Sequence, residues 1–183
     1  EICIIPVVSA QDMYRAVMKQ APKSDVVIMA AAVSDYRPKK FSRHKIKKKA
    51  GSMRLELVRT SDILARLGAN QNKRSDKLTV SPKYIGHGEL RRTMKRWHRQ
   101  APLLVGFAAE TNHVVAHARK KLRAKNCDLI VANAVNQKNG GFGSDFNQVF
   151  IIDRDQKIIK TPRLSKQKIA RLIISLIERK LSK

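Results

Sequence analysis

The stretch LLVGFAAETNHVVAHARKKLRAKNCDLIVA, residues 103–132, contains two continuously apolar runs separated by a polar segment of helical length. The apolar runs, residues 103–108 and 127–132, have the composition of strands that are covered on both faces of a parallel sheet. Between them, Thr111 or Asn112 can cap a helix that we expect to extend to Asn126. This strand, helix, strand order predicts an α/β fold with a mostly parallel sheet.

The same kind of unit precedes this stretch. Residues 26–32 (VVIMAAA) are again continuously apolar and predict a further buried strand. Upstream, the β-branched residues 1–8 predict a first strand. Ser9 and Asp12 have the spacing of a capping box, which predicts a helix that ends near Gln20.

Less regular segments lie between these units. Residues 33–52 are polar and rich in Lys and Arg, so we expect a loop or flap. Alternation of Met53, Leu55 and Leu57 with polar residues predicts a half-exposed strand, and residues 61–67 predict a short helix that ends at Gly68. Residues 69–100 are polar, and we expect them to form an insertion whose structure the sequence does not define.

The C-terminal part of the chain predicts a hairpin and a helix. Residues 148–152 and 157–160 are apolar runs that flank a polar turn, as in a hairpin at a sheet edge. A final helix is expected to begin at Ser165, with one apolar face. That face consists of Ile169, Leu172, Ile173, Leu176 and Ile177. Residues 1–183 therefore predict a single Rossmann-like, three-layer α/β domain.

The charge of the chain limits its partners. Thirty-nine Lys and Arg against fourteen Asp and Glu give a formal charge of +25, which attracts any polyanion. Few aromatic residues are interleaved with this charge, so platforms for stacking bases are not evident. A basic nucleic-acid-binding module that keeps the α/β fold remains the alternative function, and it predicts DNA binding with a steep salt dependence.

Other features of the composition indicate a cytoplasmic protein. Cys3 and Cys127 lie in apolar runs and are expected to be small core residues in a reducing compartment, not a disulfide or a metal site. No apolar run is long enough to cross a membrane. Residues 1–9 lack both a basic leader and an initiator Met, so we expect the sequence to be a piece of a longer protein.

Ligands of doubly wound sheets bind at the carboxyl ends of the strands, so we searched the segments that follow each predicted strand. After the first lies AAVSDYRPKK, residues 31–40, in which Asp35 can accept a hydroxyl or hold Mg²⁺, or can simply cap a turn. After the second, Lys121 and Lys125 share one helical face, which suits a triphosphate but also fits an ordinary solvated surface.

Several common signatures are missing from the sequence. The glycine-rich segment after the third strand, residues 132–147, permits close backbone approach but also fits a surface loop. There is no Walker motif, dinucleotide fingerprint or nucleophile elbow. His113 and His117 are four residues apart, yet no third zinc ligand accompanies them.

Taken together, the motifs resemble one family. They are AAVSDYRP, KIKK at residues 45–48, LVRTSDILARLG at residues 57–68, GFAAET, the Lys121 and Lys125 pair, DLIVAN at residues 128–133 and GFGSDFN at residues 141–147. In this order they resemble phosphopantothenate-cysteine ligase, in many bacteria the C-terminal half of a bifunctional protein whose other half is a flavin decarboxylase. The resemblance spans nearly the whole chain.

The resemblance implies a reaction and its partners. Bacterial members use CTP with Mg²⁺ to activate 4'-phosphopantothenate as an acyl-cytidylate, and L-cysteine then displaces CMP. It further implies a homodimer, with FMN present only if a decarboxylase is fused upstream. Family members begin with a Gly-rich phosphate loop and an Asn before a Ser-Ser-Gly run, and nothing in residues 1–183 corresponds. We therefore expect this chain to carry the nucleotide-binding part, with a preceding segment completing acyl transfer.

The resemblance also implies a set of site residues. The positions that match nucleotide contacts are Met29, Ala30, Ala31, Ala32, Asp35, Lys45, Ser61, Asp62, Ile63, Leu64, Phe107, Lys121 and Lys125. Within this set, Asp35 is the expected Mg²⁺ ligand, and Lys45 matches a catalytic flap lysine that closes over the reacting centre. Ser61 stands where many members have Pro.

Overall fold

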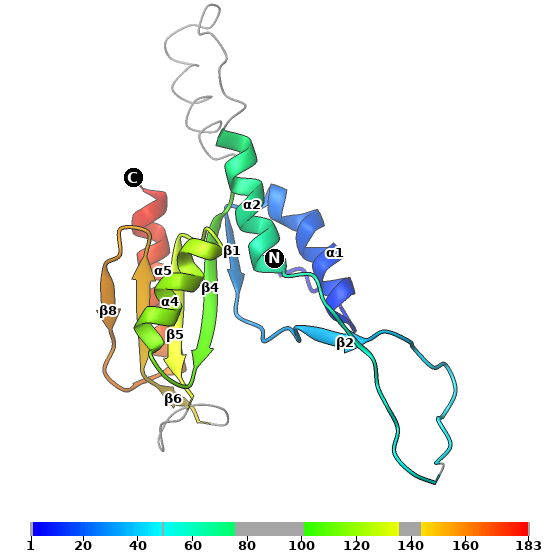
Figure 1. Cartoon of the computed structure of the whole chain (residues 1–183). Helices are drawn as coiled ribbons and strands as arrows, with labels where there is room; N and C mark the ends of the chain where they lie inside the picture. The colour runs from blue at the N-terminus through cyan, green and yellow to red at the C-terminus, as the bar shows by residue number, and fades with distance from the viewer. Residues whose placement is uncertain (1, 49, 76–100, 136–143, 183) are drawn as a thin grey trace, which may run out of the picture.

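The computed structural model describes residues 2–48, 50–75, 101–135 and 144–182 (Figure 1). Its centre is a five-stranded sheet in the order β1-β4-β5-β7-β8. The parallel part contains β1 (Val26–Met29), β4 (Leu103–Glu110) and β5 (Leu129–Ala134). β7 (Val149–Asp153) and β8 (Ile158–Lys160) continue the sheet as an antiparallel hairpin. The predicted α/β fold and its edge hairpin are confirmed.

Helices cover both faces of this sheet. α1 (Ala10–Gln20), the short 3-10 helix η1 (Ala21–Lys23), α2 (Ile63–Ser75) and α4 (Val114–Ala124) pack on one face, where Ile130 and Ile152 are buried. α5 (Lys166–Leu181) packs on the other face against Val131 and Ile151. Successive strand residues thus point into opposite cores, as alternation along a strand requires. The three-layer prediction is confirmed.

The helix that covers the second face begins and packs as its sequence predicts. The Ser165 side chain accepts a hydrogen bond from the Lys168 amide at 3.3 Å and caps α5. Ile169, Ile173 and Ile177 are buried against the sheet. Just before α5, β9 (Leu164–Ser165) pairs with β6 (Phe146–Asn147). Among the described residues, no helix combines the length and apolar character needed to cross a membrane.

The N-terminal predictions were right in part. The capping box is confirmed, because the Asp12 amide donates to the Ser9 hydroxyl at 3.2 Å and the Ser9 amide donates to Asp12 Oδ2 at 3.1 Å. The predicted strand over residues 1–8 is wrong, since residues 2–8 form no strand and Ile2 and Ile4 are exposed. Cys3 is therefore exposed instead of buried.

The first strand of the sheet is shorter and more open than its apolar run suggests. β1 ends at Met29 and forms one edge of the five-stranded sheet, with Ile28 41% exposed. Covering on both faces was therefore the wrong expectation for this strand. Ile28 is the one exposed residue of β1, so one face of this strand is only partly covered; an apolar run does not show whether neighbouring elements cover both faces.

Residues 36–48 and 50–59 form an arm that extends away from the sheet (Figure 1). Its base is β2 (Tyr36–Pro38) paired antiparallel with β3 (Leu57–Arg59), and Lys39 Nζ lies 2.6 Å from Glu56 Oε1 beside it. The strand predicted around Met53 and Leu55 is wrong, because both side chains are exposed and only Leu57–Arg59 have strand partners in β2.

Helix boundaries around α2 and α4 also differ from the predictions. α2 continues through Gly68 to Ser75, so this glycine does not end the helix, and residues 69–75 of the expected insertion are helical. Residues 76–100 lie outside the described part of the chain. α4 begins after His113, which has φ 43° and makes no side-chain cap, instead of after Thr111 or Asn112.

Gly68 serves a close contact between helices instead. A Cβ at this position would lie 1.9 Å from the backbone oxygen of Lys125, the residue that follows α4. The Asn126 side chain donates to the Gly68 carbonyl oxygen at 3.0 Å, and Asn126 itself has φ 48°. Only a residue without a side chain permits this approach of α2 to the end of α4.

We predict that Gly68→Ala destabilises the fold, although alanine favours a helix more than glycine does. The added Cβ would overlap the Lys125 backbone oxygen, so the two helices must separate, at a cost of about 1–3 kcal/mol in the free energy of unfolding. Urea unfolding followed by circular dichroism measures this change. Asn70→Ala, at an exposed position of the same helix, should instead stabilise slightly; a stabilised Gly68→Ala would contradict the close contact.

Candidate functional site

The N-terminus of α2 meets the C-terminal end of α4 at a cluster of charged residues. Lys125 Nζ donates a hydrogen bond to Asp62 Oδ2 and forms an ion pair with it. The other carboxylate oxygen of Asp62 accepts from the Ala65 amide at 2.8 Å, which caps the first turn of α2. Asp62 therefore links the two helices through both of its oxygens.

The charge state of Asp62 follows from these contacts. Partial burial favours the neutral carboxyl, but the hydrogen bonds from Lys125 and the Ala65 amide outweigh it and lower the pKa of Asp62. The positive charge of Lys121 also lowers this pKa. The structure thus pairs two of the predicted residues, Asp62 and Lys125, and Lys121 lies one helical turn before Lys125.

Beneath this cluster lies the middle of β4. Gly106 is level with Met29 of β1 in the parallel register. A Cβ on Gly106 would lie 2.7 Å from a methyl group of Leu64 and equally close to one of Ile130, so the helix rests directly on the strand. Met29 and Ile63 are 8% and 4% exposed. These predicted site residues form the packed base of the site, so a ligand could reach their backbone more readily than their side chains.

The segment after β1 lies at the start of the arm. Ala30, Ala31, Ala32 and Asp35 are exposed, as is Ser61 just before α2. The Asp35 carbonyl oxygen accepts from the Thr60 amide at 2.9 Å, and the Ser34 carbonyl oxygen accepts from the Thr60 hydroxyl at 2.5 Å. These bonds fix the backbone at Asp35 and leave its carboxylate facing solvent. Within the described ranges, no group of three or more His, Cys, Asp or Glu could hold a metal ion.

Two predicted residues lie apart from the charged cluster. Lys45 is exposed on the arm, which Figure 1 shows extending away from α4. The Phe107 side chain packs in the core beneath α5, on the opposite face of the sheet from Lys121 and Lys125. The structure therefore does not gather all the predicted side chains into one pocket.

The carboxyl end of β4 carries a pair that the sequence analysis missed. Glu110 Oε2 lies 3.2 Å from His117 Nδ1, and the ring of His113 meets that of His117 edge-on with centroids 6.1 Å apart. Glu110 is the last residue of β4, and His117 follows it by seven residues. Once the end of β4 is known, this spacing could have predicted that the two side chains meet. The sequence analysis considered these histidines only as zinc ligands.

Arg154, in the turn between β7 and β8, holds the loop that carries Lys125. It donates to the backbone oxygens of Asn126 at 3.0 Å and Cys127 at 3.2 Å, and it pairs with Asp128 at 3.0 Å. Burial raises the pKa of the Cys127 thiol to about 12, which keeps it protonated and confirms its place in the core. No local pattern connects Arg154 with this loop, so sequence reasoning could not find it.

Comparison with known proteins gives the family. The model of the family described as "DNA/pantothenate metabolism flavoprotein C-terminal domain" matches residues 1–82 and 89–181. The coenzyme A biosynthesis bifunctional protein CoaBC of Bacillus subtilis is 43% identical over 162 residues, which cover 88% of this chain and 33% of that protein. The chain thus spans about one third of the length of this curated relative.

Solved structures have the same fold. The C-terminal domain of a coenzyme A biosynthesis bifunctional protein CoaBC is similar with a TM-score of 0.65 and 35% identity, over 97% of this chain and 65% of that one. A Cab2 mutant in complex with phosphopantothenate-cysteine has a TM-score of 0.64 at 17% identity, over 97% of this chain and 52% of that one, which shows the fold alone. Because the family model matches nearly all of its residues, this chain belongs to the DNA/pantothenate metabolism flavoprotein C-terminal domain family.

Proposed function

We propose that this chain is the nucleotide-binding part of a phosphopantothenate-cysteine ligase of coenzyme A biosynthesis. In the proposed reaction, a carboxylate oxygen of 4'-phosphopantothenate attacks the α-phosphorus of CTP, and the bond to the β-phosphate breaks to release pyrophosphate. The amine of L-cysteine then attacks the acyl carbon, loses a proton and displaces CMP. Support comes from the family, from the coenzyme A biosynthesis proteins related to it, and from the cluster of Asp62, Lys121 and Lys125.

The observation that carries this proposal is the ion pair of Lys125 with Asp62 at the N-terminus of α2, with Lys121 one helical turn before Lys125. A triphosphate needs its negative charge neutralised before its α-phosphorus can be attacked. Lys121 and Lys125 supply positive charge, and the first turn of α2 adds the favourable end of a helix dipole. In the structure the ion-pair partner of Lys125 is Asp62. We infer that a bound triphosphate replaces the Asp62 carboxylate as this partner.

Asp35 and the arm complete the proposed site. Mg²⁺ in nucleotide sites is held by one or two carboxylates together with substrate phosphates, so the single exposed carboxylate of Asp35 fits this ion. When bound, Mg²⁺ would neutralise phosphate charge. Lys45, on the arm, would close over the reacting centre, which requires the arm to move or the lysine to come from a second subunit.

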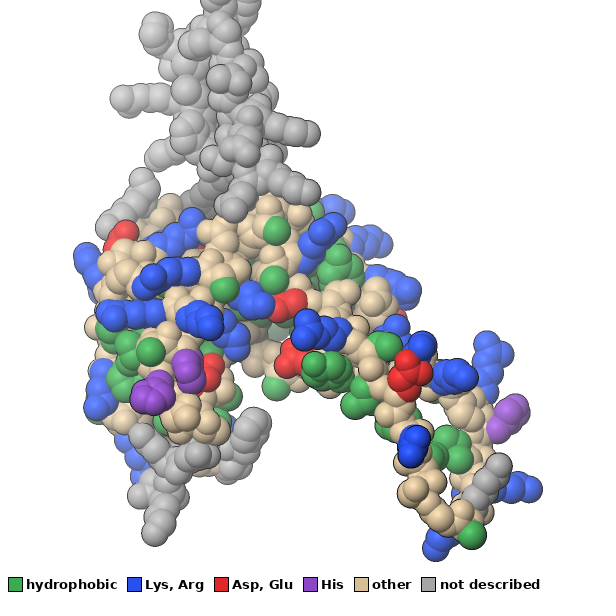
Figure 2. Space-filling view, viewed as in Figure 1, with side chains coloured by type: hydrophobic (Ala, Val, Ile, Leu, Met, Phe, Trp, Pro, Cys, Tyr) green, Lys and Arg blue, Asp and Glu red, His purple; other side chains and the backbone are tan. Residues whose placement is uncertain are grey.

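Exposed apolar side chains on the arm support a homodimer. Phe41 is 87% exposed and Ile46 is 64% exposed, and Figure 2 shows hydrophobic side chains along this part of the surface. Large apolar side chains gathered on one projection favour a protein partner. We propose a second copy of the chain as that partner, in the cytoplasm. FMN would belong to a decarboxylase in the remaining part of a bifunctional protein.

We predict that CTP with Mg²⁺ raises the melting temperature of the protein, because a ligand that binds only the folded state stabilises it by mass action. ATP should raise it less, since a pyrimidine pocket excludes the larger base. Differential scanning fluorimetry at fixed ionic strength measures both shifts. Equal shifts with CTP, ATP and inorganic triphosphate would indicate that the net charge of +25 binds the phosphates without a nucleotide pocket.

Lys121→Ala and Lys125→Ala should each weaken CTP binding by about 1.5–3 kcal/mol, the contribution of one charge-assisted hydrogen bond. Lys166→Ala, at an exposed position in the first turn of α5, removes the same charge far from the cluster and should change little. Calorimetric titration with CTP compares the three variants. If all three weaken binding alike, the cluster contributes no more than a diffuse basic surface.

Lys45→Gln should lower the rate of ligation by at least about 10²-fold in the full-length protein, as expected for loss of one preorganised electrostatic contact to the transition state. The Kd for CTP should change much less, because a flap lysine acts mainly on the rate. Lys48→Gln, on the same exposed loop, is the matched control. Normal turnover in Lys45→Gln, or equal losses in both variants, would remove Lys45 from the mechanism.

A further inference from the structure

Glu110 and His117 form a pair at the ligand-binding end of the sheet that the proposed function leaves without a role. Glu110 is the last residue of β4, and ligands of parallel sheets bind at the carboxyl ends of the strands. Glu110 Oε2 lies 3.2 Å from Nδ1 of His117, which is in the first turn of α4. We call these two residues the Glu110–His117 dyad. The end of a strand and the start of a helix thus bring a carboxylate and an imidazole together.

Backbone hydrogen bonds hold both members of the Glu110–His117 dyad. The Glu110 carbonyl oxygen accepts from the Val135 amide at 3.0 Å, and the His117 amide donates to the His113 carbonyl oxygen at 3.0 Å. The Glu110 side chain is 21% exposed, whereas that of His117 is 45% exposed. The carboxylate is therefore mostly covered, and the imidazole remains open to a ligand that arrives from solvent.

The hydrogen bond within the dyad determines which nitrogen of His117 can act as a base. An ionised carboxylate only accepts hydrogen bonds, so Nδ1 carries the hydrogen that Glu110 accepts. In a neutral imidazole with this tautomer, Nε2 has the lone pair that can take a proton. The carboxylate also fixes the orientation of the ring and stabilises the imidazolium that forms. This arrangement is that of a general base.

The proposed ligation requires a base for its second step. At neutral pH the amine of L-cysteine is an ammonium group, which has no lone pair and cannot attack the acyl carbon. A base must therefore remove one proton before attack, and histidine is the residue that most often performs such a transfer in enzymes. The site needs an imidazole or a carboxylate that is accessible and is not held by a cation.

The carboxylates of the proposed nucleotide site are poorly suited to this transfer. Partial burial favours the neutral form of Asp62, but the hydrogen bonds from Lys125 and the Ala65 amide outweigh it and lower the pKa of Asp62. A carboxylate with a lowered pKa is a weaker base. Asp35 is the proposed ligand of Mg²⁺. Neither carboxylate is therefore the better acceptor for the proton of cysteine.

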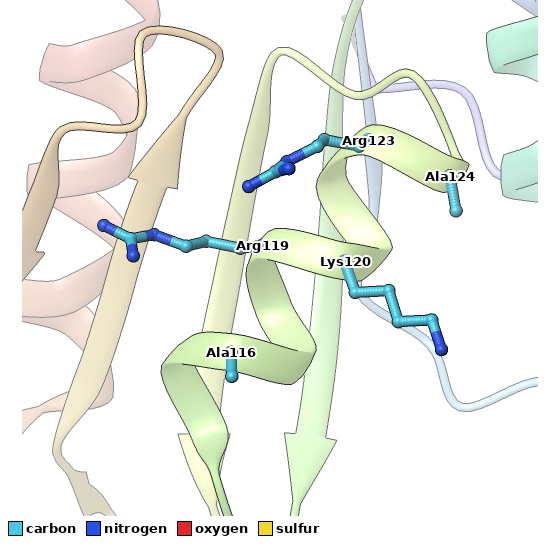
Figure 3. A pocket seen from close by; sticks show the side chains of 5 residues that line it. All are labelled: Ala116, Arg119, Lys120, Arg123 and Ala124. Carbon is cyan, nitrogen blue, oxygen red and sulfur yellow. The ribbon is translucent and has the colours of Figure 1, made fainter.

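The other charged side chains of α4 do not supply a base either. Figure 3 shows Arg119 and Arg123 extending toward β7, while Lys120 extends to the other side of the helix. Arginine and charged lysine side chains are donors without an acceptor lone pair. His117 is the one residue of α4 that carries an imidazole. The helix therefore offers a single side chain with the chemistry of a proton acceptor.

His117 lies near the lysines of the proposed nucleotide site along α4. Lys121 follows His117 by four residues, and the Lys125 amide donates to the Lys121 carbonyl oxygen at 2.9 Å. Residues four apart on a helix are neighbours on one face, with Cβ atoms about 5–6 Å apart. The acyl group of an acyl-cytidylate is bonded directly to its phosphate. An intermediate whose phosphate binds Lys121 therefore has its acyl carbon within reach of the adjacent turn, where His117 lies.

We propose that His117 accepts a proton from the ammonium group of cysteine, and that Glu110 positions His117 for this transfer. This inference rests on the proposed function. One proton of the ammonium group passes to His117 Nε2, and the nitrogen then forms its bond to the acyl carbon. The bond from that carbon to the phosphate oxygen breaks with its electron pair. The second proton of the nitrogen goes to this oxygen as CMP leaves, and His117 returns its proton to water.

The two half-reactions of the full-length protein separate this role from a structural one. Formation of the acyl-cytidylate is measured without cysteine, as exchange of labelled pyrophosphate into CTP in the presence of 4'-phosphopantothenate. Transfer to cysteine is measured by rapid quench from the preformed intermediate. His117→Gln should leave the exchange rate unchanged and lower the transfer rate by about 10²-fold, the size expected for loss of one general base.

Two further measurements depend on the proton itself. Hydroxylamine is an uncharged amine at neutral pH and needs no base before it attacks, so His117→Gln should transfer the acyl group to hydroxylamine at the rate of the unsubstituted protein. Added imidazole should restore part of the transfer rate to cysteine in His117→Ala, because it can take the place of the missing ring and accept the proton. A residue that only supports the fold would give neither result.

The contribution of Glu110 is tested through His117. Glu110→Gln keeps an oxygen that can accept from Nδ1 and removes the charge, so the transfer rate to cysteine should fall by about tenfold. In the background of His117→Gln, the same substitution should cause no further loss, because the carboxylate acts only through the imidazole. Additive losses in the double variant would show that Glu110 does not act by positioning His117.

The matched control is His113→Asn. It removes the imidazole next to His117, and asparagine tolerates the positive φ of residue 113, so transfer to cysteine should be normal. A loss as large as that in His117→Gln would overturn the inference, because the start of the helix and not the base would then be responsible.

The remaining outcomes separate this inference from the proposed function. Normal transfer in His117→Gln, or an equal loss of exchange and transfer, would overturn the role of the Glu110–His117 dyad and leave the ligase reaction in place. If the unsubstituted protein shows no exchange of pyrophosphate into CTP, the proposed function fails, and this inference fails with it.

Discussion

The contact between Gly68 and the backbone of Lys125 is the constraint on which the site depends. α2 can lie against the end of α4 only because Gly68 has no side chain, and the Asn126 amide holds that contact. Arg154 fixes the same loop from the side of β7 and β8. The position of Lys125 opposite Asp62 is thus determined by backbone packing. A chemical group placed in this way needs little reorganisation when a ligand arrives.

The Asp62–Lys125 pair also shows how a very basic protein can keep a selective site. Most of the excess positive charge lies on side chains in water, where each contributes little to binding. At the α2 N-terminus, Asp62 pairs with Lys125, and the hydrogen bond from the Ala65 amide holds its carboxylate in place. An incoming anion must compete with Asp62 there. Competition of this kind discriminates between ligands, because only one that supplies more negative charge than a carboxylate gains by replacing it.

The sequence predicted the elements whose signal is local. The apolar runs of β4, β5 and β7, the capping box of Ser9 and the apolar face of α5 were all identifiable, since each depends on residues close together in the chain. Features that depend on distant partners were not. The low helix propensity of glycine predicted a helix end at Gly68, because the sequence does not show that the Lys125 backbone lies against this residue. Residues 2–8 have the composition of a strand, although no described strand pairs with them. In the candidate site, Asp62 and Lys125 were each identified, but their pairing across the fold was not.

The order of strands in the sheet has a consequence for how the chain folds. β4, β5, β7 and β8 are neighbours in the sheet in the same order as in the sequence, with α4 packed against β5 and β7. β1, by contrast, pairs with β4 across the long separation from Val26 to Leu103. Closing that loop costs chain entropy before any contact compensates for it, so short-range pairings form sooner. We therefore expect β4, α4, β5, β7 and β8 to form the folding nucleus. β1 and α1 would dock later, which makes β1 the strand of the sheet that opens most readily in the native state.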